Sequence, residues 1–304
     1  MRRIKIAALM LCLAMLSVCF FACADTPTIE ISDDGYWIIN GEKTDVKAEG
    51  ADGKDGVDGQ GGIAENPYEL DFYPQDDGTY AVAAGKAELL SKIEIPATYK
   101  GKPVTAIKGN GFSGCTNLAS ITIPDSVTSI GERAFYDCSS LTSIEIPDSV
   151  TSVGERAFAG CSSLMYNEYD NAYYLGNSSN PYLLLMKAKD KTITSCNINV
   201  NTRFIYSYAF SDCYGLTSMV IPDGVTSIGS YAFYYCSRLA SIVIPDSVTS
   251  IGYSAFDGSH RLTSIEFEGT KAQWNAISKG SSWNNGTGNY TVYCTDGDIA
   301  KSNS

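Results

Sequence analysis

Apolar residues recur along the chain at a spacing of 23 positions. One column holds the residue that opens each expected strand, and it runs through Ile93, Ile121, Ile144, Cys196, Met219, Ile242 and Ile265. The first interval, from Ile93 to Ile121, is 28 positions, because that coil is five residues longer. A second column, of phenylalanine, runs through Phe112, Phe135, Phe158, Phe210, Phe233 and Phe256. Two columns that keep one register at this period indicate a repeat architecture.

One repeat contains the parts of a short coil. Leu141, Ile144 and Ile146 have the spacing of a leucine-rich strand. Pro147 ends the hydrogen bonding of that strand, and Gly154 permits the next bend. The other inward positions are Val150, Val153, Ala157, Phe158 and Cys161. A lone coil buries too little apolar surface to offset the ordering of its backbone, so coils must stack. The sequence predicts an α+β repeat solenoid, with short parallel strands and short helical or irregular turns.

The solenoid is expected to extend over residues 91–269, with one irregular coil at 162–195. The interval from Ile144 to Cys196 is 52 positions, six more than two ordinary repeats. This stretch contains two strand-like runs, which an Asn/Ser loop at 177–180 joins.

The first 90 residues precede the repeats and divide into four segments. Residues 1–22 read as a signal peptide, because a basic start is followed by an apolar core. Residues 23–47 are expected to form a short β-hairpin with a tight turn at Asn40-Gly41. Residues 48–65 contain glycine at every third position without proline, which predicts a flexible, self-repelling spacer. Residues 66–90 predict an N-terminal cap.

Two cleavage sites compete at the end of the signal peptide. Ala22 before Cys23 resembles a bacterial lipobox, so Cys23 is a candidate lipidation site and membrane anchor. The same residues with Ala24 also fit ordinary cleavage after position 24, which would release the chain. In both cases we expect an exported bacterial protein, at the cell surface or secreted. No later apolar run is long enough to span a bilayer.

Residues 270–304 are expected to close the solenoid as a C-terminal cap. Thr270 and Gln273 match a capping box for a short helix. That helix is expected to carry Trp274 and Ile277, to stop at Gly280, and to be followed by a last strand at 290–294.

Four segments of the chain share an almost identical pattern, IPDSVTSIGERAFYDC (123–138), IPDSVTSVGERAFAGC (146–161), IPDGVTSIGSYAFYYC (221–236) and IPDSVTSIGYSAF (244–256). This pattern resembles the BspA-type leucine-rich repeats of bacterial surface proteins. The resemblance covers roughly residues 85–295. It implies adhesion to host extracellular-matrix proteins or to other cells.

The formal net charge of −12 is unevenly distributed. Residues 25–77 carry 15 acidic and 3 basic side chains, whereas residues 78–304 carry 19 and 16. A nearly neutral body argues against a nucleic-acid partner, which needs a basic surface. His260 is the only histidine, and the chain has no catalytic or cofactor motif. We therefore expect no enzyme activity and no cofactor.

The cysteines follow the repeat rather than a disulfide framework. They lie three positions after the phenylalanines, at Cys115, Cys138, Cys161, Cys213 and Cys236, with Ser259 in the last coil. Coils stacked about 4.7–4.9 Å apart exceed the Cβ separation of about 3.8 Å that a disulfide prefers. A straight column also lacks the mixed angles of a metal site. We expect free, buried thiols and no metal, with Cys196 in the core.

Two sets of acidic residues are expected to have no catalytic or metal role. Asp52, Asp55 and Asp58 lack the spacing of a calcium loop and predict solvated spacer acids. In adjacent coils, glutamate is followed by arginine, at Glu132-Arg133 and Glu155-Arg156. This arrangement predicts a surface ion-pair ladder.

Candidate binding residues lie at outward positions of the second half of the solenoid. Val220 and Val243 interrupt an otherwise mostly polar outward row, side by side. Tyrosine also accumulates beyond what the core requires, at Tyr208, Tyr231, Tyr234, Tyr235, Tyr173, Tyr174 and Tyr182. Tyrosine gives a large contact area with a polar tip, although it is also common on ordinary β-rich surfaces.

The function expected from these observations is that of an exported, surface-anchored repeat protein that binds a macromolecular partner, namely a protein outside the cell. One alternative is a glycan-capture protein, in which Trp274, Trp283 and the tyrosines stack on sugar rings. A further alternative, an enzyme or enzyme accessory, lacks a catalytic motif.

Overall fold

The computed structural model describes residues 29–31, 36–39, 42–47 and 66–301. The chain divides into two compact units, Met1–Ile63 and Ala64–Ser304. The expected signal peptide, the candidate lipidation site Cys23 and the glycine-rich spacer lie outside the described residues.

The N-terminal unit contains a small antiparallel sheet. Its strands are β1 (Ile29–Ile31), β2 (Tyr36–Ile39) and β3 (Glu42–Lys47), in the order β1-β2-β3. Ile39 pairs with Glu42 across the Asn40-Gly41 dipeptide. Residues on both sides of this dipeptide therefore form antiparallel strands, the arrangement that a two-residue hairpin turn produces.

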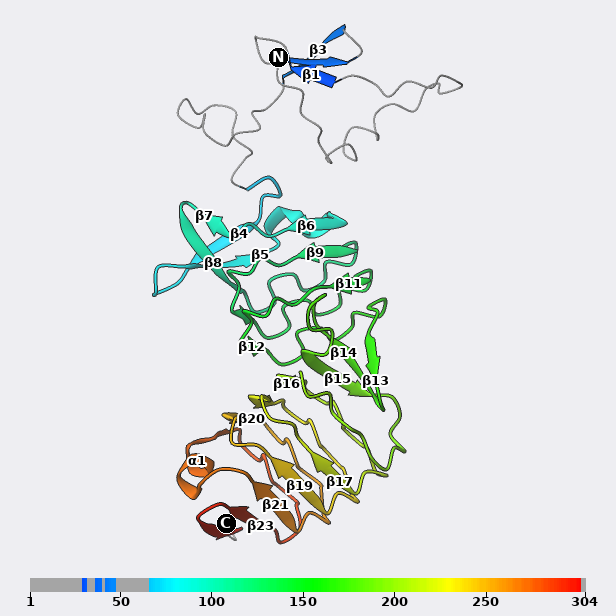
Figure 1. Ribbon diagram of the computed structural model, residues 1–304, viewed down its shortest axis with the longest axis vertical. Helices are drawn as coiled ribbons and strands as arrows, with labels where there is room; N and C mark the ends of the chain where they lie inside the picture. Colours follow the sequence, from blue (N-terminus) through cyan, green and yellow to red (C-terminus); the bar gives the residue numbers. More distant parts are fainter. Residues whose placement is uncertain (1–28, 32–35, 40–41, 48–65, 302–304) are drawn as a thin grey trace. The chain divides into compact units, whose positions relative to one another are not determined.

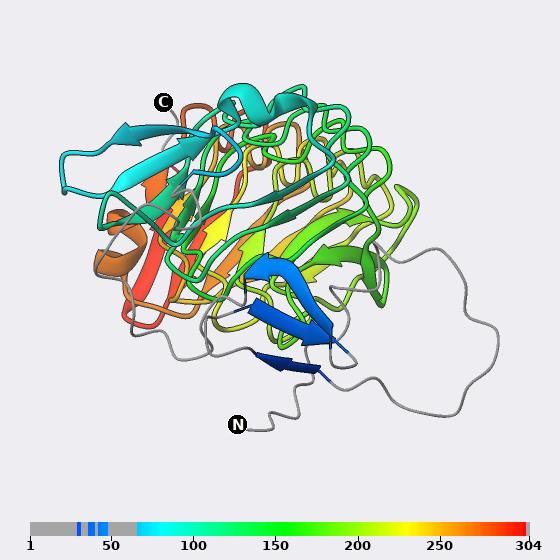
Figure 2. The same cartoon turned by 90° about the horizontal axis from the view of Figure 1, so that it is seen from above.

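The C-terminal unit is a solenoid of stacked coils with parallel strands (Figures 1 and 2). In its first half, one ladder contains β4 (Asp71–Pro74), β5 (Tyr80–Ala83), β8 (Lys102–Ile107), β10 (Ser129–Ile130) and β12 (Ser152–Val153). The short strand β7 (Thr98–Tyr99) pairs with β8. The other ladder contains β6 (Lys92–Glu94), β9 (Ser120–Thr122) and β11 (Ser143–Ile144). A 3-10 helix, η1 (Gly85–Leu89), precedes β6.

The second half of the solenoid repeats this arrangement. One sheet contains β13 (Asn167–Tyr169), β14 (Ala172–Leu175), β15 (Leu184–Ala188), β16 (Phe204–Ile205), β18 (Ser227–Ile228), β20 (Ser250–Ile251) and β22 (Ser278–Lys279). The other contains β17 (Ser218–Val220), β19 (Ser241–Ile244), β21 (Ser264–Phe267), β23 (Thr291–Cys294) and β24 (Gly297–Ala300). One six-residue helix, α1 (Lys271–Ala276), lies between β21 and β22 along the chain.

The register of the strands confirms the repeat. Ile121 pairs with both Ile93 and Ile144, and Ile242 pairs with both Met219 and Ile265. The predicted class was wrong in one respect. Within the described residues α1 is the single α-helix, and the coils are otherwise joined by turns. The fold is a β-solenoid of the leucine-rich-repeat kind rather than an α+β solenoid.

The phenylalanine column forms the centre of the core. Neighbouring rings stack with centroids 5.5 Å apart from Phe112 to Phe135 and from Phe135 to Phe158. In the second half the separations are 5.2 Å for Phe210 and Phe233, and 5.1 Å for Phe233 and Phe256. All of these rings are buried. Parallel stacking at this distance is a favourable aromatic arrangement that continues from coil to coil.

The cysteine column is buried beside the rings, and its thiols are free, as predicted. Three of these thiols, those of Cys138, Cys161 and Cys236, also have a partner that sequence reasoning did not foresee. Cys138 donates to the carbonyl oxygen of Phe112 at 3.0 Å, and Cys236 donates to that of Phe210 at 3.1 Å. Ser259 makes the equivalent bond to Phe233 at 3.0 Å. This repeat position therefore suits a small side chain that donates a hydrogen bond, and a hydroxyl can take the place of a thiol.

The glycine column has a different role from the predicted one. Gly154 does not have a positive φ. Instead, a Cβ placed on Gly154 would lie 2.3 Å from the backbone nitrogen of Glu132 in the preceding coil, and one on Gly252 would lie 2.3 Å from that of Ser230. Glycine is required here because two backbones approach closely, rather than because the chain must bend.

The irregular coil interrupts the solenoid between β12 and β16. β12 is the last strand of the first-half ladder, and the antiparallel strands β13, β14 and β15 begin the next sheet (Figure 1). At the break, Tyr206 occupies the position that glycine holds in neighbouring coils. Its ring is buried and packs 6.2 Å from Phe158. The core accordingly divides into two clusters that meet at this coil.

The C-terminal cap agrees with prediction at its start and differs at its end. The Thr270 side chain accepts from the Gln273 backbone and the Gln273 side chain accepts from the Thr270 backbone, which completes the capping box. The helix ends at Ala276, however, and not at Gly280, which follows β22 and contacts the preceding coil. The predicted last strand is also followed by β24, which pairs antiparallel with β23.

Candidate functional site

The solenoid places a column of left-handed residues just before the buried Ala-Phe pair of each coil. In the first half this column holds Arg133 and Arg156, with φ of 52° and 55°. In the second half it holds Tyr208 and Tyr231, with φ of 64° and 58°. Non-glycine residues rarely adopt positive φ. The stacking maintains it here, since the Arg133 N–H and the Tyr208 N–H each bond to the next coil.

Tyrosines of adjacent coils form one continuous set of ring contacts, which we call the tyrosine tract (Tyr208, Tyr231, Tyr234, Tyr235 and Tyr253). Tyr208 and Tyr231 stack with centroids 4.7 Å apart and an interplanar angle of 12°. Tyr231 meets Tyr253 edge-on at 5.2 Å and Tyr234 at 5.4 Å. Tyr234 in turn lies 4.5 Å from Tyr235. The structure therefore brings four of the predicted binding residues together.

Tyr253 is a member of the tract that sequence reasoning missed. It lies one position before the left-handed column, where the first half carries Glu132 and Glu155. Its ring is 43 % exposed, close to the 47 % of Tyr235. The sequence signal for Tyr253 is that an aromatic residue replaces the glutamate found at this repeat position in the first half.

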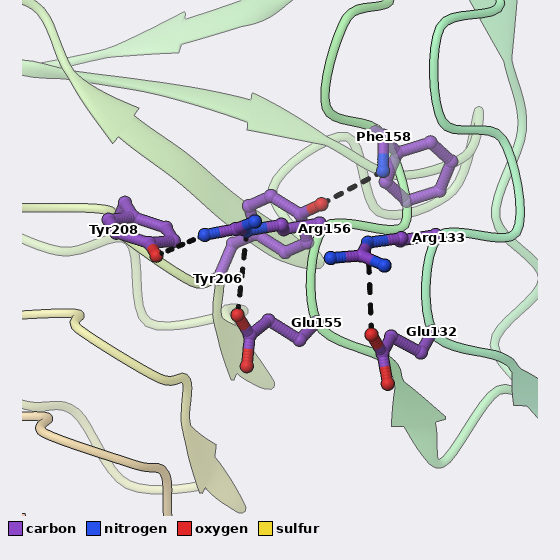
Figure 3. Close-up of polar contacts among 7 residues, drawn as sticks. All are labelled: Glu132, Arg133, Glu155, Arg156, Phe158, Tyr206 and Tyr208. Atoms are coloured by element: carbon purple, nitrogen blue, oxygen red, sulfur yellow. Dashed lines mark hydrogen bonds and ion pairs between the residues drawn. The ribbon is translucent and has the colours of Figure 1, made fainter.

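Arg156 joins the tract to the first half of the solenoid (Figure 3). Its Nη2 donates to the Tyr208 hydroxyl at 2.7 Å, and its guanidinium lies 5.5 Å from the centre of that ring. Its Nε lies 3.5 Å from Glu155. The hydrogen bond to Tyr208 raises the pKa of Arg156. Arg133 forms a longer pair with Glu132, at 3.8 Å, and its guanidinium lies 6.0 Å from the centre of the Tyr136 ring. Both pairs are surface pairs within one coil, in a single row as predicted.

The electrostatic environment of the tract is acidic. Desolvation raises the pKa of Tyr234, and the nearby Tyr235 and Asp257 raise it further. Desolvation also raises the pKa of Tyr231, together with the hydroxyls of Tyr253 and Tyr208. The raised pKa values keep the hydroxyls of Tyr231 and Tyr234 available as hydrogen-bond donors.

The tyrosines of the irregular coil form a separate cluster. Tyr173 lies 5.8 Å from Tyr166, and Lys187 Nζ lies over both rings, 5.6 Å and 4.9 Å from their centres. Tyr182 packs edge-on against Tyr174 at 5.5 Å. Tyr174 is fully buried, so its predicted place on a binding surface was wrong. Burial explains why its pKa is raised.

Val220 and Val243 form a third site, on the face of another sheet. They pair directly in the parallel ladder of β17 and β19, so their side chains lie side by side as predicted. Val220 is 62 % exposed and Val243 is half-buried. The next residues in this row are Glu266 and Tyr293. The valine pair is a small apolar area bounded by polar and aromatic side chains.

In the described part of the chain, few side chains could serve a catalytic or metal centre. Within residues 66–301 no three His, Cys, Asp or Glu residues are grouped so that they could hold a metal ion. His260 is exposed, and its Nδ1 lies 2.6 Å from the carbonyl oxygen of Gly286. Its ring extends the tract, 6.1 Å from Tyr235. None of the helices in the described ranges could cross a bilayer.

The two tryptophans belong to the packing of the C-terminal cap. Trp274 is buried, 5.3 Å from Phe267 and 5.9 Å from Trp283. Trp283 is half-buried against Phe256 and Tyr290. These contacts leave the Trp274 ring without an open face for stacking on a sugar.

Comparison with known proteins gives a clear result for the repeats. A family described as the BspA type leucine rich repeat region matches the chain in six copies, over residues 85–179 and 188–283. None of the curated proteins matches.

Several solved structures are similar to parts of the chain. A leucine rich repeat protein from T. pallidum is 24 % identical, covering 70 % of this chain and 83 % of its own, with a TM-score of 0.39. A leucine rich cell surface protein from Faecalibacterium prausnitzii is 22 % identical, covering 69 % and 96 %, with a TM-score of 0.26. The pneumococcal vaccine antigen PcpA is 18 % identical, covering 65 % and 58 %, with a TM-score of 0.30.

Proposed function

Because the chain belongs to the BspA type leucine rich repeat family, we propose that it is an exported bacterial surface protein that binds a protein partner outside the cell through the tyrosine tract. The partner class we propose is a host extracellular-matrix or cell-surface protein. The proposal contains no catalytic step and no cofactor.

The observation that carries this proposal is the continuity of the tract across three coils. Its rings touch in an unbroken series from Tyr208 to Tyr235, and Tyr253 and Tyr235 remain well exposed. Tyrosine and arginine are the side chains that most often dominate binding at protein interfaces. A stiff solenoid holds such side chains in place before binding, which lowers the entropy lost on association. Affinity would come from many moderate contacts along the row.

The chemistry of the tract favours a partner segment with basic side chains. Arg156 already shows how a guanidinium docks on this surface, since it bonds to the Tyr208 hydroxyl and lies over its ring. Cation–π contacts of this kind are favourable when they are partly desolvated. Asp257 and Asp212 lie near enough to Tyr234 to raise its pKa. Lysine or arginine from a partner would find both rings and carboxylates there.

Two further parts of the proposal concern regions away from the tract. Val220 and Val243 would supply a second contact area, on the sheet of β17 and β19. Lipidation at Cys23 would anchor the protein, with residues 48–65 as the spacer that separates it from the membrane. Mass spectrometry of the mature N-terminus tests the anchor, because a lipidated cysteine and a free residue differ by the mass of the acyl chains.

Trp274 is a poor candidate for the glycan-capture function that the sequence offers as an alternative. Stacking on a sugar needs an accessible ring face, and Trp274 is buried among Phe267, Trp283 and Lys279. Glycans therefore serve as the comparison class in the test.

The decisive experiment is a binding array of purified extracellular-matrix proteins and polysaccharides, probed with the purified exported protein. The proposal expects saturable binding to at least one protein. Saturable binding to polysaccharides alone would contradict it.

A further inference from the structure

The irregular coil departs from the repeat at a run of consecutive positions. Regular coils read IPDSVTSI or a close variant, as at 123–130 and 244–251, whereas residues 198–205 read INVNTRFI. The changed positions are Asn199 for proline, Val200 for aspartate, Asn201 for serine, Thr202 for valine, Arg203 for threonine and Phe204 for serine. The other coils serve as an internal control, because the fold tolerates the common sequence at every one of these positions.

Four of the altered residues line one cleft. Val200, Asn201, Thr202 and Arg203 form part of the wall of a cavity of about 510 Å³. Asp148 of the preceding coil and Asn180 of the inserted loop complete it on one side. On the other side lies Gly224, where the regular coils have Ser126, Ser149 and Ser247. The cleft thus lies where three changes coincide, namely the inserted loop at 177–180, the missing side chain at Gly224 and the altered residues 199–204.

The inserted loop is tied firmly to the preceding coil at this cleft. Asn177 Nδ2 donates to one Asp148 carboxylate oxygen at 2.9 Å, and Ser179 Oγ donates to the other at 3.2 Å. Asn180 Nδ2 donates to the Asn201 carbonyl oxygen at 2.9 Å. The wall that carries these groups is consequently held in place before any ligand arrives.

Two polar side chains at the cleft, Arg203 and Thr202, have hydrogen-bonding capacity that contacts within the protein leave unused. Arg203 Nη1 donates to the Asp148 carbonyl oxygen at 3.2 Å, and within residues 66–301 no carboxylate forms an ion pair with this guanidinium. Thr202 is 1 % exposed, and its Oγ1 is the one buried side-chain oxygen or nitrogen of the described residues that lacks a hydrogen-bond partner. An unpaired buried hydroxyl is destabilising relative to the valine of the other coils.

We propose that this cleft binds a neutral saccharide unit. Its walls carry one positive charge (Arg203) and one negative charge (Asp148), so a strongly charged ligand gains little. Together with the Asn201 amide they offer both donors and acceptors, which vicinal hydroxyls match because each can donate and accept. Val200, 75 % exposed at the rim, offers an apolar contact to ring C–H groups. The cleft is open to solvent, and its volume of about 510 Å³ is in the range of small-molecule sites.

This site is separate from the tyrosine tract and does not depend on the function proposed for it. The test uses saturation-transfer NMR on the full purified protein. The probes are the methyl glycosides of glucose, galactose, mannose and N-acetylglucosamine, with glucuronate and inorganic phosphate as anion probes. The test variant is Val200→Asp with Arg203→Thr, which restores the residues that the next coil carries at Asp223 and Thr226. The control is Arg238→Thr, which removes an exposed arginine away from the cleft.

The expected result is saturation transfer to at least one methyl glycoside, with affinity reduced at least about tenfold in the double variant, as for the loss of a charged hydrogen bond. The control should bind as the unaltered protein does. Binding of none of the glycosides, binding that survives the double variant, or binding of glucuronate and phosphate alone would each overturn the proposal. Binding to matrix proteins through the tract should be unchanged in all three proteins.

Discussion

The hydroxyl oxygen of Tyr206 accepts a hydrogen bond from the backbone N–H of Phe158 at 2.8 Å. In the other coils the equivalent N–H donates to the next coil, as from Phe135 to Ala157 at 2.8 Å and from Phe210 to Ala232 at 2.7 Å. The irregular coil keeps the regular bond to the coil after it, because the Ala188 N–H donates to the Ala209 carbonyl oxygen at 2.8 Å. One side chain therefore satisfies the backbone where the two halves of the solenoid meet (Figure 3).

Replacing Tyr206 by phenylalanine should destabilise the protein by about 1–3 kcal/mol, because the ring is kept while the buried Phe158 N–H loses its acceptor. Urea unfolding measures the change. Tyr214→Phe is the matched control, since Tyr214 is 51 % exposed and should change little. Equal stabilities of the two variants would mean that the hydroxyl of Tyr206 contributes nothing at the junction.

Gly154→Ala should destabilise the solenoid by about 1–3 kcal/mol or more, as overpacking does. The new Cβ would lie 2.3 Å from the Glu132 backbone nitrogen, and backbone atoms cannot move aside without shifting a whole coil. Gly109→Ala is the control, because its nearest neighbour atom lies 3.5 Å away. Thermal unfolding of both variants compares them. If they melt at the same temperature, the close approach of the coils is not what requires glycine.

The buried thiols should make the protein less stable at high pH. Burial raises the pKa of Cys115 and of Cys213 to about 12 from an ordinary value of 9.0. The folded state therefore holds these protons more tightly than the unfolded chain does. Their contribution is complete below about pH 9 and is lost as the pH rises toward about 12.

Unfolding free energies at about pH 8 and about pH 11 test this expectation. Cys115→Ser with Cys213→Ser should lose less stability between the two conditions, since serine does not titrate and Ser259 shows that a hydroxyl fits the column. An identical loss in the double variant would assign the pH dependence to other groups.

Thr202→Val should stabilise the protein by about 1 kcal/mol, because it removes a buried hydroxyl that has no partner among the described residues. The regular coils already carry valine at this position, as at Val150 and Val225. Thr249→Val is the control, since the Thr249 hydroxyl donates to the Thr226 carbonyl oxygen at 3.2 Å. A loss of stability in Thr202→Val would show that the hydroxyl has a partner, such as a bound water.

The regular coils could be read from the sequence because each inward position recurs. Phe135 and Ile144 are in the core for the same reason as Phe233 and Ile242, and one coil predicts the rest. The register was therefore predictable without knowing the turn geometry. The turns could not be predicted in this way, because the 23-residue period does not specify the backbone φ angles. Gly154 was therefore expected to permit a bend, whereas it is required by the close approach of two coils.

The position of the irregular coil could be predicted from the sequence, but its structure could not. An excess of six residues between Ile144 and Cys196 shows that a coil is longer, but it does not say which backbone groups lose their neighbours. That Tyr206 would take a glycine position, and that Tyr174 would be buried while Tyr182 is not, depends on packing across the break. The tract was predictable in part, because Tyr208 and Tyr231 share a column, whereas Tyr253 reaches it from the neighbouring column.

The most direct test of the account exchanges the column between the two halves of the solenoid. Tyr208→Arg with Tyr231→Arg reproduces the residues found at Arg133 and Arg156, which adopt the same left-handed backbone, so the fold should be kept. Thr151→Arg with Thr249→Arg adds the same charge at exposed positions elsewhere. Surface plasmon resonance against a panel of purified extracellular-matrix proteins measures binding. The account predicts binding at least about tenfold weaker for the tyrosine exchange alone, with an unchanged melting temperature. Equal affinity of the exchange variant and the unaltered protein would contradict it.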